Sequence, residues 1–151
     1  MLDLPELSRV VGPDLDLGRL LAAASADRHR FVARTLTEWR TGANRFDQPG
    51  EGFFLAHEGG EIVGMCGLNI DPYANNPAVG RIRHLYVLPL TRRSGVGTLL
   101  VAECLDLAAG VFDRVRLRTV EPTAAAFYTT IGFQESAEEY ATHEIALTDA
   151  S

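Results

Sequence analysis

The chain has 151 residues, of which 46% are hydrophobic and 23% charged, a composition typical of one globular domain and unlike that of a disordered chain. Its formal net charge of −6 argues against nucleic acid as a partner, because phosphate binding needs a basic face. The acidity suits a cationic amine as substrate, although it is also ordinary for a soluble protein. All 14 basic residues are arginine, which excludes the chemistry of an active-site lysine.

No segment approaches the roughly 20 consecutive apolar residues of a membrane span, and the first residues do not resemble a signal peptide. Cys66 and Cys104 lie in apolar segments without metal-ligand spacing, so we expect two buried free thiols and no metal site. We therefore expect a single domain over residues 1–151, located in the cytoplasm and without a membrane partner.

The first half of the chain predicts two helices and a hairpin. After a short strand around Leu7 to Val11, Asp14 and Asp16 can cap a helix with its apolar residues on one face. The second helix has its apolar residues at the spacing i, i+4, i+7, namely Val32, Leu36 and Trp39, and can end at Gly42. The apolar runs 53–56 and 62–68 flank a glycine turn and predict a hairpin.

The second half predicts strands alternating with helices. A strand over 80–87 is followed by a helical stripe from Val96 to Ala108 and then by a strand over 115–120. Pro122 suits the first turn of another helix, whose inward residues are expected to be Ala124, Phe127 and Ile131. Strands over 133–134 and 142–147 complete a mixed sheet, with its central strand–helix–strand unit parallel and right-handed.

The turn between the strand 80–87 and the helix after it has the chemistry of an anion site. Free backbone N–H groups and the positive dipole end of a helix attract phosphate, and glycine allows a bulky anion to come close. Gly95 and Gly97 supply the glycines, and Arg92 and Arg93 add positive charge. The turn lacks both the Walker motif and the third glycine of the dinucleotide fingerprint. A tight strand-to-helix turn with solvated arginines explains the pattern equally well.

Two motifs together resemble the GNAT superfamily of N-acetyltransferases. The first is Leu85-Tyr86-Val87-Leu88-Pro89 followed by Arg92-x-x-Gly95-x-Gly97, which is similar to the family's coenzyme A signature. The second, over 124–133, contains Phe127-Tyr128 and ends at Gly132-Phe133. The resemblance implies an α/β fold with a mixed, mostly antiparallel sheet, in which a central parallel strand pair splays apart between flanking helices. It also implies acetyl-CoA as the acyl donor.

The resemblance implies a set of cofactor-binding residues. In such enzymes pantetheine lies in the gap between the splayed strands, and backbone amides of the turn hold the pyrophosphate. On this basis the Val87 N–H would also stabilise the developing oxyanion. The residues implicated are Leu85, Tyr86, Val87, Arg92, Arg93, Ser94, Gly95, Val96, Gly97, Thr98, Phe127 and Tyr128.

Tyr128 is the expected general acid, which would protonate the departing thiolate. Its alternative role is core packing, but Phe127 and Ile131 are expected to fill that role on the same helix. His84 and Glu121 are the candidate bases for the amine proton. Strand alternation places His84 on the face opposite Leu85 and Val87 unless a bulge re-aims it. Glu121 stands where relatives often have asparagine, and an N-terminal helix charge explains it as well.

The acceptor is expected to be a primary amine on a small molecule or a peptide, and Tyr73 in the loop 71–77 is a candidate contact. The main alternative is a non-catalytic acyl-CoA-binding or regulatory domain of the same fold. A generic nucleotide-binding domain is a third hypothesis. Dimers are frequent among similar enzymes, so a homodimer is left open.

Overall fold

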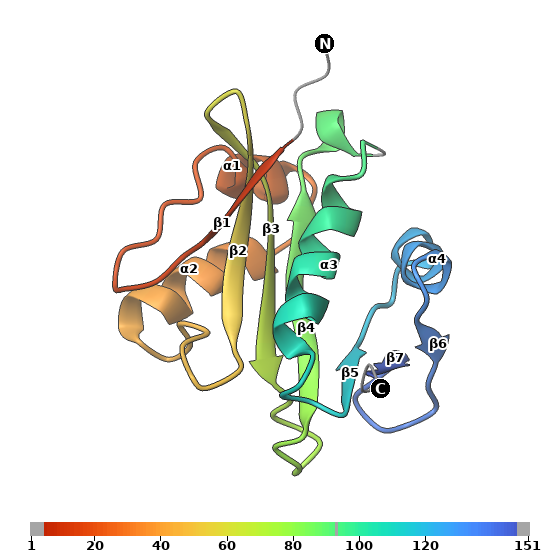
Figure 1. Cartoon of the computed structure of the whole chain (residues 1–151). Coiled ribbons are helices and arrows are strands. Elements are labelled where there is room, and N and C mark those ends of the chain that lie inside the picture. Colours follow the sequence, from red (N-terminus) through yellow and green to blue (C-terminus); the bar gives the residue numbers. More distant parts are fainter. Residues whose placement is uncertain (1–4, 93, 148–151) are drawn as a thin grey trace.

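The computed structural model describes residues 5–92 and 94–147, which form a seven-stranded sheet with helices on its faces (Figure 1). In chain order the elements are β1 (Glu6–Arg9), α1 (Leu20–Ala26), α2 (Phe31–Thr41), β2 (Gly52–Glu58), β3 (Glu61–Ile70), β4 (Val79–Val87), a 3-10 turn (Pro89–Thr91), α3 (Val96–Ala108), β5 (Arg114–Leu117), α4 (Pro122–Thr130), β6 (Gln134–Glu135) and β7 (His143–Ala146).

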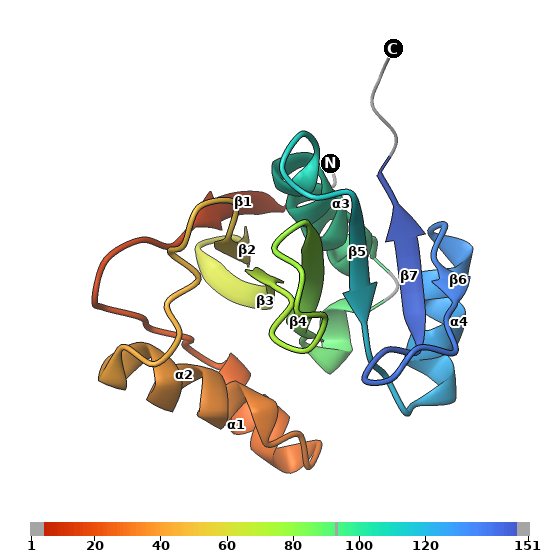
Figure 2. The ribbon, with the colours of Figure 1, turned by 90° about the horizontal axis from the view of Figure 1, so that it is seen from below.

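The strands stand in the order β1-β2-β3-β4-β5-β7-β6. The pair β4–β5 is parallel and every other pair is antiparallel, because α3 connects β4 to β5 as a crossover while hairpins join most of the rest. Seen from below, α1 and α2 cover one face of the sheet and α3 covers the other (Figure 2). The predicted fold class is confirmed.

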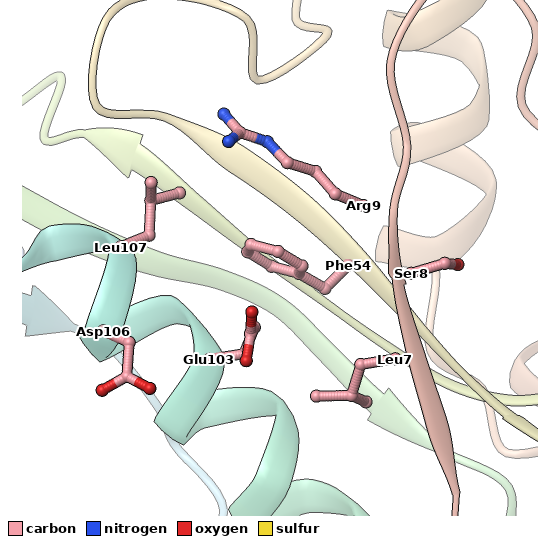
Figure 3. A pocket seen from close by; sticks show the side chains of 7 residues that line it. All are labelled: Leu7, Ser8, Arg9, Phe54, Glu103, Asp106 and Leu107. Carbon is pink, nitrogen blue, oxygen red and sulfur yellow. The ribbon is translucent and has the colours of Figure 1, made fainter.

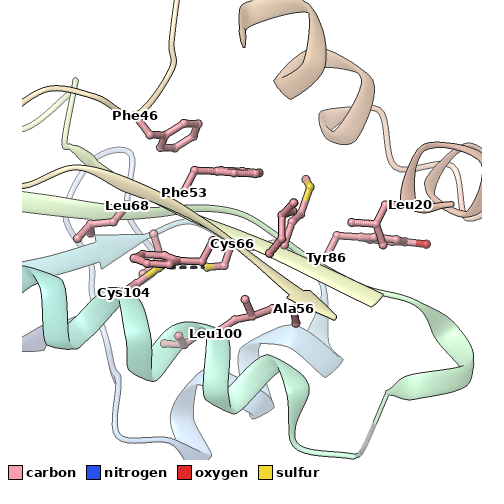
Figure 4. Packing of buried hydrophobic residues seen from close by; sticks show 14 of the residues in the cluster. Leu20, Phe46, Phe53, Ala56, Cys66, Leu68, Tyr86, Leu100 and Cys104 are labelled. Atoms are coloured by element: carbon pink, nitrogen blue, oxygen red, sulfur yellow. Dashed lines mark hydrogen bonds between the residues drawn. The ribbon is translucent and has the colours of Figure 1, made fainter. Parts of the chain in front are cut away.

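The core lies between α3 and the sheet and between the sheet and α1–α2 (Figure 4). Trp39 and Phe53 are fully buried on the α2 side, and their rings meet edge to face at 5.5 Å. On the α3 side, Cys104 lies 3.7 Å from Cys66, sulfur to sulfur, and both are free thiols. The expectation of two buried thiols is confirmed.

The central strand pair opens into a fork. Only Val79, Gly80 and Arg81 of β4 pair with β5, opposite Arg114 to Arg116. Strand β4 then continues to Val87, whereas β5 ends at Leu117. The stretch from Ile82 to Val87 therefore has no strand partner on its β5 side, and this gap (the fork) is the main interruption in the backbone pairing of the sheet.

Several element predictions were wrong in detail. Asp14 and Asp16 do not cap a helix: α1 begins later, at Leu20, and the Asp16 carboxylate instead accepts a hydrogen bond from the Gly18 N–H at 2.8 Å. The strand expected over 115–120 stops at Leu117, because the chain leaves the sheet at the fork. The end of α2 at Gly42, with φ of 81°, is confirmed.

In the part of the chain that the structure describes, no helix is long and apolar enough to cross a membrane. The same residues contain no cluster of three histidine, cysteine or acidic side chains that could hold a metal ion.

Candidate active site

The backbone of β4 offers hydrogen-bonding groups to the fork. The Leu88 N–H donates to the Val63 carbonyl at 2.8 Å, which turns the backbone groups of Leu88 towards β3. Alternate residues of an antiparallel strand turn these groups to opposite sides, so those of Leu85 and Val87 point into the fork. Both residues were predicted to bind pantetheine. The N–H and C=O of Leu85 and the N–H of Val87 point into the fork, whereas the Val87 carbonyl accepts a hydrogen bond from Arg92.

A bulge in β4 lies at the centre of the fork. Met65 pairs with Tyr86 and Gly67 with Arg83, so the single residue Cys66 opposes both His84 and Leu85. His84 takes the extra position with φ of 63°, in the left-handed region. The bulge leaves His84 and Tyr86 on the α1–α2 face, where both rings lie near Phe31, whereas Val87 lies near Gly97 of α3.

The predicted phosphate turn forms the start of α3. Gly95 is the N-cap residue with φ of 89°, a conformation that glycine adopts without strain. A Cβ on Gly97 would lie 3.4 Å from the ring of Phe127 and 3.8 Å from Val87, so this glycine keeps a narrow space between α3 and α4 open. Val96 is buried in the core, Ser94 and Thr98 are exposed, and Arg93 lies outside the described residues.

Arg92, predicted to bind the cofactor, forms an ion pair with Asp27. Its Nη2 lies 2.8 Å from the Asp27 carboxylate, its Nε donates to the Val87 carbonyl at 3.0 Å, and it lies over the Tyr86 ring. The Tyr86 hydroxyl donates to the same carboxylate at 2.9 Å. These hydrogen bonds from Tyr86 and Arg92 lower the pKa of Asp27, and burial together with Asp27 raises the pKa of Tyr86 to about 12. Arg92 thus fastens the turn to the end of α1.

Tyr128 is the buried residue of α4, with 6% of its surface exposed, whereas Phe127 and Ile131 are only half-buried. Phe127 and Ile131 were expected to be the core residues of this helix in place of Tyr128. That expectation was wrong, because Tyr128 is at the centre of the face of α4 that meets the sheet. Burial raises its pKa strongly, and the thiols of Cys66 and Cys104 add to the effect. Its ring lies 5.1 Å from that of Phe127, 5.4 Å from that of Phe133 and 6.4 Å from that of His143 on β7, centroid to centroid.

His84 is enclosed by aromatic rings. Its ring centroid lies 5.9 Å from that of Phe31 and 6.1 Å from that of Phe46. Its Nε2 is buried and has no hydrogen-bond partner among the described residues. Burial, and next the charges of Arg83 and Arg34, lower its pKa to about 3. The imidazole is therefore neutral at physiological pH but too weakly basic to take a proton readily from an amine.

Glu121 lies on the β5 side of the fork, directly before α4, and its side chain is 57% exposed. Its Oε1 is 3.9 Å from the Nε2 of His29, which belongs to the connection between α1 and α2. Nothing in the sequence around His29 indicated a site. A lone histidine in a polar connection has no recognisable spacing to a residue 92 positions later.

Tyr73 lies in the loop before β4, at the opposite end of that strand from Val87. Its ring stacks on Tyr140 at 4.7 Å, and the Arg81 guanidinium lies 5.0 Å from its centroid. The structure does not bring Tyr73 to the part of the fork that holds Leu85, Val87 and Tyr128.

A hollow of about 350 Å³ lies between α3 and the strands β1 and β2 (Figure 3). Its lining includes Phe54, Glu103 and Asp106, and it contains none of the residues predicted for the site. It belongs to the β1 edge of the sheet and not to the fork.

Comparison with known proteins gives a family and a set of similar structures. The model of the GNAT acetyltransferase domain matches residues 49–135. A provisionally named acetyltransferase from Exiguobacterium sp. 255-15 is 30% identical, with a TM-score of 0.83 over 95% of this chain and 94% of that one.

Two more distant structures share the fold. One is an acetyltransferase from Streptococcus agalactiae 2603, with 16% identity and a TM-score of 0.70 over 93% of this chain and 95% of the other. The second is a mutant of the AtaT toxin bound to the C-terminus of the antitoxin AtaR, with 14% identity and a TM-score of 0.70 over 95% of this chain and 92% of the other. Comparison with curated protein sequences gives no match.

Proposed function

The chain belongs to the GNAT acetyltransferase family, and on this premise we propose that it transfers the acetyl group of acetyl-CoA to a primary amine by direct attack. The acceptor would be a small molecule or a peptide. The observation that carries the proposal is the fork, where Leu85 and the Val87 N–H have no strand partner on the β5 side, at the end of β4 that leads into the turn and α3.

The residues at the fork fit the acyl donor. A pantetheine arm is a chain of two amides, which can hydrogen-bond to the edge of β4 as a strand would. The diphosphate is an anion that suits the free N–H groups at the start of α3, and Gly97 leaves room beside Phe127 for it to pass. Because Arg92 is already paired with Asp27, this anion site depends on backbone amides and the helix dipole more than on Arg92.

Tyr128 supplies the proton that the coenzyme A sulfur needs as the carbon–sulfur bond breaks. A general acid must be protonated before it acts, and the phenol, whose pKa lies above the ordinary tyrosine value, is in that form at neutral pH. The Val87 N–H, which points into the fork, is placed to stabilise negative charge on the thioester oxygen. His84 is a poor base because its pKa is about 3.

The test is an acceptor screen in which thiol release from acetyl-CoA is followed with a panel of primary amines and peptides. The proposal expects release that depends on the amine, together with a product heavier by one acetyl group in mass spectrometry. A protein that binds acetyl-CoA in calorimetry but acetylates none of these acceptors would instead be an acyl-CoA-binding domain.

A further inference from the structure

One contact joins the α1–α2 connection to the β5 side of the fork. His29 follows α1, and Glu121 follows β5 on the way to α4. The Nε2 of His29 and the Oε1 of Glu121 lie 3.9 Å apart although the two residues come from distant parts of the chain. Both side chains retain access to solvent, with 25% and 57% of their surface exposed.

Three contacts of its own fix the position of His29. Its backbone N–H donates to the Ala24 carbonyl at 2.8 Å, which ties it to the end of α1. Its ring lies 5.3 Å from the ring of Phe31 and edge-on to Tyr86 at 5.8 Å. Tyr86 stands in β4 between Leu85 and Val87, the two residues whose backbone faces the fork. His29 therefore lies beside Tyr86, on the face of β4 that α1 and α2 cover.

We propose that His29, oriented by Glu121, is the base that accepts the proton of the attacking amine. The inference rests on the proposed function and deepens it by naming the base for which His84 is unsuited. In this assignment His29 touches the substrate and is a catalytic residue, whereas Glu121 acts through His29 and is a positioning residue. A carboxylate beside one ring nitrogen orients the imidazole.

The proton balance of the reaction follows from this arrangement. The ammonium gives one proton to His29, and the neutral nitrogen then forms a bond to the acetyl carbon and loses a second proton to solvent. The carbon–sulfur bond breaks as Tyr128 gives one proton to sulfur, so the products are an amide and a free thiol. His29, which is 25% exposed, returns its proton to solvent, and Tyr128 takes one up from solvent before the next turnover, so no further reactant is needed.

Two other titratable groups, Asp27 and Tyr86, lie near His29. The carboxylate of Asp27 lies at the end of α1. Its pKa is lowered mainly by hydrogen bonds from Tyr86 and Arg92, and His29 makes a smaller contribution. The Tyr86 phenol stays protonated because its pKa is about 12. Glu121 is the acidic group in contact with the imidazole itself, and Asp27 already accepts two hydrogen bonds from other partners.

The experiment compares wild type with His29→Gln and Glu121→Gln, using an amine from the acceptor screen between pH 7 and pH 10. We expect His29→Gln to lower kcat/KM roughly 10²-fold at pH 7, with a smaller loss in Glu121→Gln. The deficit should shrink towards pH 10, because an alkylamine with a pKa of about 10 then loses its proton to solvent. Added imidazole should restore part of the rate of His29→Gln, and the affinity for acetyl-CoA should stay unchanged.

His57→Gln is the matched control, because His57 bonds to Ser8 on the β1–β2 pair and is not at the fork. Full activity of His29→Gln at pH 7, or a deficit that does not change with pH or imidazole, would overturn the proposal while leaving acetyl transfer intact. Glu121 is exposed, so Glu121→Gln should fold, and a normal rate in that variant would reject the positioning role. A wild type that acetylates no amine would remove the proposed function, and this inference with it.

Discussion

At the scale of single residues, Tyr128 combines two roles that sequence reasoning treated as alternatives. It packs against Phe127 and Phe133, with ring centroids at 5.1 and 5.4 Å, and so belongs to the core. Burial also raises the pKa of its phenol strongly. A tyrosine hydroxyl is protonated at neutral pH even when exposed, so the packing leaves the proposed acid in the form that can donate a proton.

Replacing Tyr128 with phenylalanine should separate these roles. The ring and its contacts remain, so the free energy of unfolding should change little, whereas the loss of the proton donor should lower kcat roughly 10²-fold. Steady-state kinetics and urea unfolding of Tyr128→Phe would measure both. Tyr140→Phe is the matched control, since Tyr140 is exposed in the loop beside Tyr73. A normal kcat in Tyr128→Phe would leave the tyrosine with packing alone.

His84 should make stability depend on pH. Its pKa is about 3 in the folded chain and about 6.5 in an unfolded one, so the unfolded chain takes up the proton first as the pH falls. The stability that the neutral imidazole contributes is complete above about pH 6.5 and declines towards pH 3.

His84→Phe keeps an aromatic ring between Phe31 and Phe46 and removes the buried nitrogens. We expect its Tm to fall less steeply than that of wild type between pH 6.5 and pH 4, as measured by circular dichroism. Parallel curves for the two proteins would show that His84 does not control this window. The turnover rate of the same variant tests whether His84 acts as the base.

At the scale of elements, the end of β4 and the start of α3 form one unit. The bulge at His84 and Leu85 fixes which side chains face which layer, and Gly95, with φ of 89°, allows the chain to turn into the helix. Arg92 joins this unit to α1 through Asp27. The site therefore depends on α1 as well as on the motif itself.

A bulky side chain at Gly97 should block this unit without unfolding it. The space beside Gly97 is bounded by Phe127 and Val87, and an indole there would occupy the path between α3 and α4. Gly97→Trp should lower the affinity for acetyl-CoA at least roughly 10²-fold in calorimetry, because the contact between the diphosphate and the start of α3 would be lost. Ala102→Trp is the control, because Ala102 is an exposed residue of the same helix. Equal affinity in the Gly97 variant would place the diphosphate elsewhere.

At the scale of the whole molecule, the sheet consists of two parts that share few backbone hydrogen bonds. Strands β1–β4 and strands β5–β7 meet through three register pairs, and Asp71 reinforces the junction. Its carboxylate is fully buried and binds Arg81 on β4 at 3.1 Å and Arg116 on β5 at 2.9 Å. Burial opposes its ionisation, but hydrogen bonds from Arg116 and the Tyr73 N–H outweigh that and lower its pKa.

Asp71→Asn should destabilise the fold by about 3–5 kcal/mol, because two buried guanidinium groups would lose their shared counter-charge. Urea unfolding at pH 7 would measure the loss. Glu61→Gln, which breaks the exposed pair with Arg19, should cost less than about 1 kcal/mol. Similar small losses in both variants would mean that the junction does not depend on Asp71. In wild type this contribution should disappear in acid, as the pH falls through the lowered pKa of Asp71.

The sequence alone determined what depends on neighbouring residues: the end of α2 at Gly42, the glycine turn ahead of α3, the helix of Tyr128 and, through two motifs, the family. These features follow from local backbone preferences and from periodicity, which a linear pattern records. Tertiary structure decided the bulge at His84, the capture of Arg92 by Asp27, the burial of Tyr128 and the contact between His29 and Glu121. Each of these depends on strand register or on segments far apart in the chain, and their energies arise only when the layers pack together.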